Sequence, residues 1–155
     1  MRISATGTRG FTLVEILVVV AIAGIVLALA AVNLFPSEAQ IARRDSEIVA
    51  LALEQARDSA WFGGRPTAVS FDGGRLREWR LAGSSWEAVP ARERALGSQL
   101  RVIAVHVDGQ ALKADERLIF LADGLGVPFR VALEVRGFSW AVEGDAAGAV
   151  KLVQG

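Results

Sequence analysis

The chain begins with an apolar run that is long enough to cross a membrane and contains one acid. Between Phe11 and Phe35 the only polar residues are Thr12, Glu15 and Asn33. As a helix this run would span about 37 Å at 1.5 Å per residue, more than a hydrocarbon core of about 30 Å. Because a carboxylate in such a segment costs free energy, we expect Glu15 to have a partner or a task.

Length and charge alone leave two interpretations of this run. The tripeptide Ala28-Leu29-Ala30 would suit a signal peptidase, and the mature chain would then begin at Ala31. Signal-peptide cores usually contain about 7–15 apolar residues, however, and have no need of an acid. The longer run with its carboxylate therefore favours a retained membrane anchor. Arg2 and Arg9 before it predict that the N-terminus stays in the cytoplasm and that the rest of the chain lies across the membrane.

The residues at the start of the run resemble a known processing signal. Gly10-Phe11-Thr12-Leu13-Val14-Glu15 follows a short basic leader and leads into the apolar segment. This combination resembles the signal of type IV pilins and type II secretion pseudopilins. The resemblance implies that a prepilin peptidase cuts between Gly10 and Phe11 and that Phe11 becomes the N-methylated first residue. Residues 1–10 would then be a leader peptide, and residues 11–35 a transmembrane and assembly helix.

The resemblance also suggests a physical role for Glu15. Once the leader is removed, the acid lies about one helical turn from the new amine on Phe11. The helix N-terminus itself favours an anion there. The amine of a neighbouring subunit would neutralise the carboxylate, so Glu15 would set the register of packed helices during assembly. The alternative is an acid that only extends to the headgroups, where its cost is tolerated.

A second, amphipathic helix is predicted in residues 36–62. Pro36 disfavours helical geometry at Phe35, and Ser37 with Gln40 fits a capping box at the start of the new helix. The expected buried seam of this helix consists of Ala42, Val49, Leu53, Ala56 and Ala60. The Gly63-Gly64-Arg65-Pro66 stretch predicts its end.

Residues 63–155 are predicted to form a β-rich head, because the apolar period falls toward two. Strands at residues 67–71 and 75–81 around Asp72-Gly73-Gly74 predict a hairpin. Further strands are predicted at residues 86–89, 100–107, 129–135, 138–142 and 149–153. In the second of these, Ile103, Val105 and Val107 are expected on one face and His106 on the opposite face, at the surface or rim. Residues 90–97 are predicted to be an exposed loop.

The order of these features is similar to one branch of the pilin superfamily. A helix ending near Trp61 precedes a Gly-Arg-Pro strand entry, then Phe120-x-x-Asp123-Gly124-x-Gly126-x-Pro128-Phe129, then a Trp140 strand before a terminal strand. This resembles the H-type minor pseudopilins (GspH) and the related FimT/FimU-type minor pilins. The resemblance implies an α+β pilin-like fold, with a long N-terminal helix packed on an antiparallel, β-sandwich-like head. It implies a minor subunit of the type II secretion pseudopilus, which drives export of folded proteins. The alternative is a minor pilin that primes a type IV pilus or takes up DNA.

Composition and motifs argue against other classes of protein. The chain has no cysteine and one histidine, so neither a disulfide framework nor a thiolate metal site is expected, and His106 lacks a defined catalytic partner. It contains no nucleophile elbow, no H-E-x-x-H and no phosphate-binding P-loop, so no enzyme, catalytic residue, cofactor or metal site is predicted. Removing Arg2 and Arg9 from the 17 basic residues leaves 15 against 17 acidic ones. A charge of about −2 would repel nucleic acid.

Partners and location follow from the resemblance. The expected partners are the prepilin peptidase, other minor and major pseudopilins, the inner-membrane assembly platform and membrane lipid. The expected location is the bacterial inner membrane. The chain would cross it once, with a cytoplasmic N-terminus and a periplasmic head.

Overall fold

The structure, a computed structural model, describes residues 11–33 and 36–155 and divides into two compact units. The units are Met1–Ser37 and Glu38–Gly155. The predicted leader with Gly10, and Phe35 at the end of the predicted membrane segment, lie outside the described residues. The predicted division into leader, anchor, amphipathic helix and head remains a prediction at its exact boundaries.

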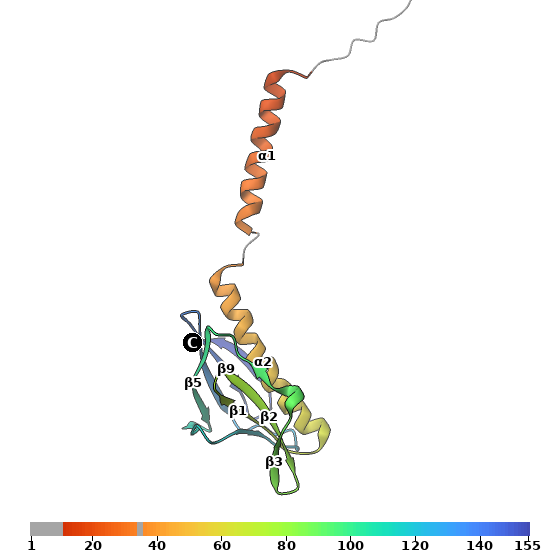
Figure 1. The fold of residues 1–155 in the computed structure, drawn as a ribbon, viewed down its shortest axis with the longest axis vertical. Coiled ribbons are helices and arrows are strands. Elements are labelled where there is room, and N and C mark those ends of the chain that lie inside the picture. The colour runs from red at the N-terminus through yellow and green to blue at the C-terminus, as the bar shows by residue number, and fades with distance from the viewer. Residues whose placement is uncertain (1–10, 34–35) are drawn as a thin grey trace, which may run out of the picture. The chain divides into compact units, whose positions relative to one another are not determined.

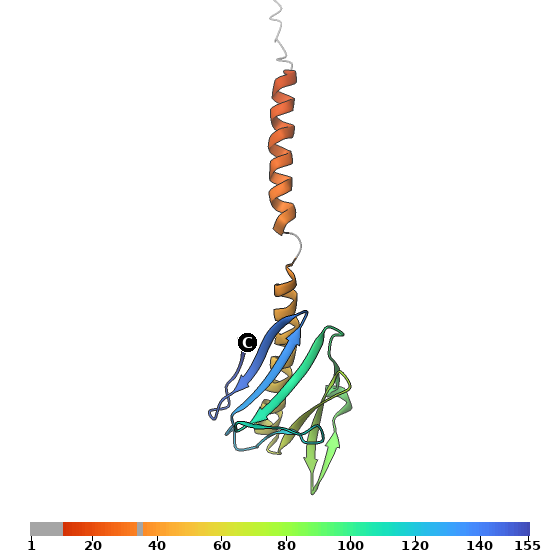
Figure 2. The same cartoon turned by 90° about the vertical axis from the view of Figure 1, so that its left-hand side faces the viewer.

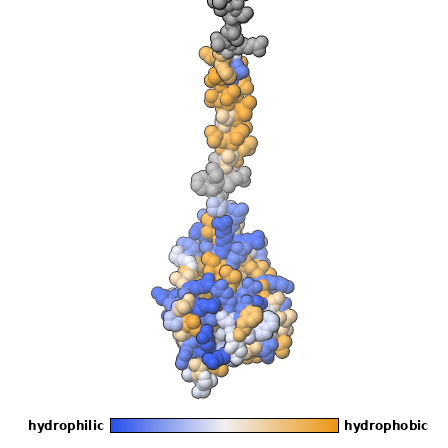
Figure 3. Space-filling model, turned by 90° about the vertical axis from the view of Figure 1, so that its right-hand side faces the viewer, coloured by the Kyte–Doolittle hydropathy of each residue, from blue (hydrophilic) through white to orange (hydrophobic). Residues whose placement is uncertain are grey.

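The first unit contains the helix α1 (Leu13–Asn33), drawn in red and orange in Figure 1, in which Glu15 and Asn33 are the only polar residues. The face of this helix that Figure 3 shows is mostly apolar. Its Leu13–Ala30 stretch is long and apolar enough to cross a membrane, and none of it is buried against other residues. Leu13, for example, is 82% exposed. A helix that is apolar all round requires lipid or other helices around it.

The second unit begins with α2 (Glu38–Gly63), which buries one face along its length. The predicted seam is confirmed, because its five residues are all fully buried: Ala42, Val49, Leu53, Ala56 and Ala60. Ser46 and Ala52 complete the buried face. The hydroxyl of Ser46 donates a 2.9 Å hydrogen bond to the carbonyl of Ala42, so this buried polar group is satisfied.

A Schellman motif ends α2. Gly64 has a φ of +59°, and its N–H donates to the carbonyl of Trp61, while the N–H of Arg65 donates to the carbonyl of Ala60. Glycine adopts this left-handed conformation without the clash that a Cβ would cause. The helix end that Gly63-Gly64 predicts is therefore confirmed.

The first sheet of the head is antiparallel and has the order β3-β2-β1-β7, with β4 also paired to β2. Its strands are β1 (Thr67–Asp72), β2 (Arg75–Ala82), β3 (Ser85–Ala88), β4 (Arg94–Ala95) and β7 (Leu118–Phe120). The predicted hairpin is confirmed by the β1–β2 register, in which Thr67 lies opposite Arg80 and Asp72 opposite Arg75.

Residues 90–97 are more regular than the predicted loop. They contain the short 3-10 helix η1 (Pro90–Arg92) and β4, which pairs with β2. The guanidinium of Arg94 donates to the side-chain oxygen of Gln55 on α2. The prediction of a loop was wrong because tertiary contacts with β2 and α2 order these residues, and no local sequence pattern predicts such contacts.

The second sheet is antiparallel and has the order β10-β9-β8-β5-β6. Its strands are β5 (Leu100–Val107), β6 (Gln110–Ala111), β8 (Phe129–Val135), β9 (Phe138–Gly144) and β10 (Val150–Gln154). Figure 2 shows the blue strands of this sheet lying across α2, and β8, β9 and β10 all contact that helix. The predicted alternation of β8 is confirmed, because its buried residues are Phe129, Val131, Leu133 and Val135.

A bulge in β5 overturns one detail of the sequence prediction. The register passes from Val102 opposite Leu133 to Ala104 opposite Ala132, and Ile103 is left without a partner. Val105 and Val107 pack against the core, whereas Ile103 is 59% exposed. The prediction that Ile103 shares their face was wrong, because a bulge inserts one residue and interrupts the period of two.

One hydrophobic core joins α2 to both sheets. It includes Leu53 from α2, Leu76 and Leu118 from the first sheet, and Val131 and Val142 from the second. Apolar side chains buried in this way each contribute about 1.5–3 kcal/mol. The head therefore has a core of its own, which α1 does not.

Candidate functional site

The first candidate site is the N-terminal motif, of which the structure describes Phe11 to Glu15. Phe11 precedes α1 and is 73% exposed. The backbone N–H of Glu15 donates to the hydroxyl of Thr12 at 3.3 Å and to its carbonyl at 3.0 Å. Thr12 is thus the N-cap of α1, and Thr12-x-x-Glu15 has the spacing of a capping box. The prediction overlooked this role of Thr12, although the spacing was present in the sequence.

Glu15 lies in the first turn of α1, and its side chain is exposed. An acid in the first turn interacts favourably with the helix dipole, so the position has a local electrostatic explanation. Within residues 11–33 and 36–155 its carboxylate has no ion-pair partner. The carboxylate oxygens are therefore accessible to a group from outside the described chain.

The second candidate site is the glycine-containing loop of residues 121–128. Gly124 has a φ of +78°, and a Cβ added there would lie 3.3 Å from Nε1 of Trp61. A Cβ added to Gly126 would lie 2.5 Å from the carbonyl oxygen of Asp145. Gly124 is required because its left-handed conformation and its closeness to Trp61 at the end of α2 both disfavour a side chain. Gly126 is required because the backbone of the β9–β10 turn leaves no space for a Cβ.

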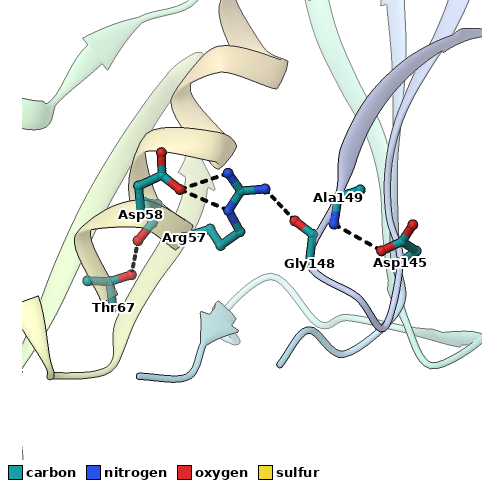
Figure 4. Close-up of polar contacts among 7 residues, drawn as sticks. Arg57, Asp58, Thr67, Asp145, Gly148 and Ala149 are labelled. Carbon is teal, nitrogen blue, oxygen red and sulfur yellow. Dashed lines mark hydrogen bonds and ion pairs between the residues drawn. The ribbon is translucent and has the colours of Figure 1, made fainter. Parts of the chain in front are cut away.

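Arg57 joins the same turn to α2 (Figure 4). Its guanidinium donates to the carbonyl of Gly148 and, at 2.7 and 3.0 Å, to the carboxylate of Asp58. Within the turn, the carboxylate of Asp145 accepts the N–H of Ala149 at 2.9 Å. The Asp-Gly-x-Gly motif of the sequence therefore forms part of a structural junction between a helix end, a loop and a turn.

His106 lies at a rim, as predicted. It lines a cavity of about 430 Å³ together with Phe129, Arg130 and Glu143. Arg130 is directly opposite His106 in the β5–β8 register and is ion-paired with Glu143. In the part of the chain that the structure describes, no group of three metal-binding side chains comes together.

Family models of known proteins match both the N-terminal motif and the head that contains the second candidate site. A family model described as "Prokaryotic N-terminal methylation motif" matches residues 6–31, and one described as "Type II transport protein GspH" matches residues 46–148. This chain belongs to the GspH family of type II transport proteins. The second match covers most of the head, including the junction at Arg57. No curated protein matches the sequence.

Solved structures of minor pseudopilins share the fold of this GspH-family chain. Two structures of EpsH from the type 2 secretion system of Vibrio cholerae have 18% and 17% sequence identity and TM-scores of 0.59 and 0.60. In both cases the matched region covers 73% of this chain, and it covers 96% of the first EpsH chain and 95% of the second. The solution structure of E. coli GspH has 18% identity and a TM-score of 0.55, covering 73% of this chain and 87% of that one. The predicted α+β pilin-like fold and the predicted family are confirmed.

Proposed function

We propose that this GspH-family chain is a minor pseudopilin, which a type II secretion system assembles into its periplasmic pseudopilus to export folded proteins. The observation that carries the proposal is that one chain combines the methylation motif at residues 6–31 with a GspH head at residues 46–148. The motif accompanies an apolar helix with no buried surface of its own, and the head has a complete core. Such a chain is suited to presenting a folded domain on a helix that stacks with others.

Processing by a prepilin peptidase is the first step of this proposal. The peptidase cuts after Gly10 and methylates the new amine of Phe11, whose exposure just before α1 is compatible with access by an enzyme. Mass spectrometry of the membrane-extracted protein tests this step. We expect a mature chain that begins at N-methyl-Phe11, and a bulky residue at position 10 should block cleavage. A mature chain beginning at Ala31 would instead identify a signal peptide.

Assembly in the inner membrane is the second step. The N-terminus lies in the cytoplasm and the head in the periplasm, since the basic leader precedes the only apolar helix in the described residues that is long enough to span. Glu15 receives the methylated amine of a neighbouring subunit, which neutralises its accessible carboxylate. Other major and minor pseudopilins and the inner-membrane platform are then the partners, and the head performs no catalysis.

Deleting the gene separates secretion from the alternative role in a type IV pilus. Release of exoproteins and twitching motility would be measured in the same deletion strain, with the restored gene as control. We expect lost secretion with normal twitching. Lost twitching or DNA uptake with normal secretion would overturn the proposal and favour a FimT/FimU-like minor pilin.

A further inference from the structure

Two exposed arginines near the end of α2 carry charges that nothing in the described chain neutralises. Arg65 follows the end of the helix, and Arg80 lies on β2 directly opposite Thr67 of β1. Side chains directly opposite each other in a sheet share a face, so Arg80 is on the face from which the Thr67 hydroxyl reaches α2. Within residues 11–33 and 36–155, neither guanidinium makes an ion pair or a hydrogen bond.

The two arginines line one cavity. Its volume is about 270 Å³, and Ser59 and Gly63 of α2 complete the lining. Among the described residues, no apolar side chain takes part in this lining, and the Ser59 hydroxyl has no hydrogen-bond partner. Guanidinium groups present several N–H donors in a planar fork that matches the oxygens of a phosphate. The cavity therefore suits a compact oxyanion.

An uncovered apolar surface adjoins this cavity. Phe62 is 80% exposed and Trp61 is 56% exposed, and their rings stack with centroids 5.2 Å apart. Because residues three positions apart are neighbours on a helix surface, Phe62 lies beside Ser59 and hence beside the cavity. The loop that packs against Trp61 at Gly124 adds Leu125, which is 65% exposed. Exposed apolar side chains grouped in this way indicate a surface that binds a protein or a membrane.

The charges around the cavity narrow the choice of ligand. Glu87 lies opposite Arg80 on β3 and makes no ion pair with it in the described chain. One acid beside two bases leaves a net charge of about +1, which suits a single phosphate better than a nucleic acid. A phosphate that carries apolar groups would fill the cavity and also cover the rings beside it. An anionic phospholipid has both parts.

The membrane anchor makes lipid the nearest ligand of this kind. In the proposed function α1 spans the inner membrane, and this step rests on that proposal. A tethered head meets the groups of its own bilayer at a high effective concentration. Aromatic and leucine side chains are also those that enter the boundary between headgroups and acyl chains, with arginine beside them.

We propose that the end of α2 binds the phosphate of an anionic phospholipid between Arg65 and Arg80, with Phe62 against the apolar part of the lipid. Free phosphate shares the chemistry of the headgroup but has no apolar part, so the two sources can be separated. The binding requires neither cleavage after Gly10 nor export of a protein. A failure to bind lipid would therefore leave the proposed role in secretion intact, and the deletion experiment tests that role separately.

The test uses the full chain in uncharged dodecyl maltoside micelles. Dihexanoyl phosphatidylglycerol, dihexanoyl phosphatidylcholine and inorganic phosphate are titrated separately, and binding is followed by tryptophan fluorescence. Trp61→Phe identifies the part of the signal that arises from Trp61. We expect saturable binding of the phosphatidylglycerol, at least about tenfold tighter than that of inorganic phosphate, because only the lipid buries apolar surface. An equal response to both lipids would show only their entry into the micelle and would overturn the proposal.

Three variants at exposed residues locate the site. Arg65→Gln combined with Arg80→Gln should weaken the binding of phosphatidylglycerol and of phosphate alike, about tenfold or more. Phe62→Ala should weaken the binding of the lipid and leave that of phosphate unchanged. Arg44→Gln is the matched control and should change neither, because Arg44 is exposed near the start of α2 and has no ion pair in the described chain.

The remaining outcomes each contradict the proposal. Unchanged lipid binding in the double arginine variant would show that these cations only complement the dipole at the C-terminal end of α2. Inorganic phosphate that binds as tightly as the lipid would identify an adventitious ion only. Tighter binding of a capped peptide of alternating glutamate and leucine would identify a protein as the ligand in place of lipid.

Discussion

The helices α1 and α2 are both long, but only α2 buries apolar side chains within its own unit. The Leu13–Ala30 stretch of α1 has no buried share, whereas α2 has a continuous buried face beginning at Ala42 and ending at Ala60. An amphipathic helix is stabilised by the sheets that it contacts, while a helix that is apolar all round depends on its surroundings. Substitutions in α2 should therefore act on folding, and substitutions in α1 on membrane insertion and assembly.

The largest effect is expected from Leu53→Asp in α2. Leu53 is fully buried in the core, so the variant removes apolar contacts and places a charge where it has no partner. We expect a loss of at least about 5 kcal/mol in the free energy of unfolding, which is enough to unfold many domains. Leu51→Asp is the matched control, because Leu51 is 49% exposed on the same helix. Urea unfolding followed by tryptophan fluorescence would measure both, and similar losses would contradict the assigned faces of α2.

The next effect is expected in α1, and it should leave the head unchanged. Glu15→Val makes the segment more apolar, so insertion and cleavage should persist, while the proposed ion pair with the amine of a neighbouring subunit can no longer form. Crosslinking of the variant to other pseudopilins should fall about tenfold or more, because unpairing a charge away from water is costly. The unfolding curve of the head serves as the internal control. Unchanged crosslinking would contradict the proposed pairing and favour the alternative, in which the Glu15 side chain only extends to the lipid headgroups.

A smaller effect is expected where β1 meets α2. The hydroxyl of Thr67, which is 1% exposed, donates a 2.6 Å hydrogen bond to the carbonyl of Ala56. Thr67→Val keeps the branched shape and removes this donor, which should reduce the free energy of unfolding by about 1 kcal/mol. Ser85→Ala, at an exposed hydroxyl, should change it by less than about 0.5 kcal/mol. If both variants lost the same free energy in urea unfolding, the hydrogen bond from Thr67 to Ala56 would not stabilise the packing of β1 on α2.

The smallest effect is expected at Glu93 and depends on pH. A hydrogen bond from Arg75, aided by the charges of Arg77 and Arg75, holds the pKa of Glu93 below its usual value. Because the pKa is lower in the folded than in the unfolded chain, the ionised carboxylate stabilises the head above the unfolded pKa of about 4.3. This stabilisation is lost as the pH falls through the folded pKa. The free energy of unfolding of Glu93→Gln should therefore be lower than that of the parent at pH 7 and nearly equal to it at pH 2.5, as measured by urea unfolding. If the difference between the two proteins grew as the pH fell, the ionised Glu93 carboxylate would not be the stabilising group.

The features that could be predicted from the sequence are those that repeat along one element. The α2 seam and the alternation of β8 each extend over several turns or residues, so a single period identifies the buried side. Three other features depend on contacts with distant segments, so the local sequence does not predict them: the short strand β7, the contacts of residues 90–97 and the bulge at Ile103. Thr12 was overlooked for another reason, since its capping pattern overlaps the processing motif. The predicted roles of Gly10, Phe11 and Glu15 involve other molecules and remain proposals.

The contact between Arg57 and Gly148 joins residues that are 91 positions apart in the chain. The sheet that covers α2 likewise ends with β10, the last strand of the chain. Contacts of such large sequence separation form slowly, because a long loop must close before they contribute any stability. Because a chain is made from its N-terminus, the part of the α2 seam that contacts β10 stays uncovered until this strand has been made. Loss of β10 alone would expose this part of the seam in the finished chain, although β1, β8 and β9 would still contact α2.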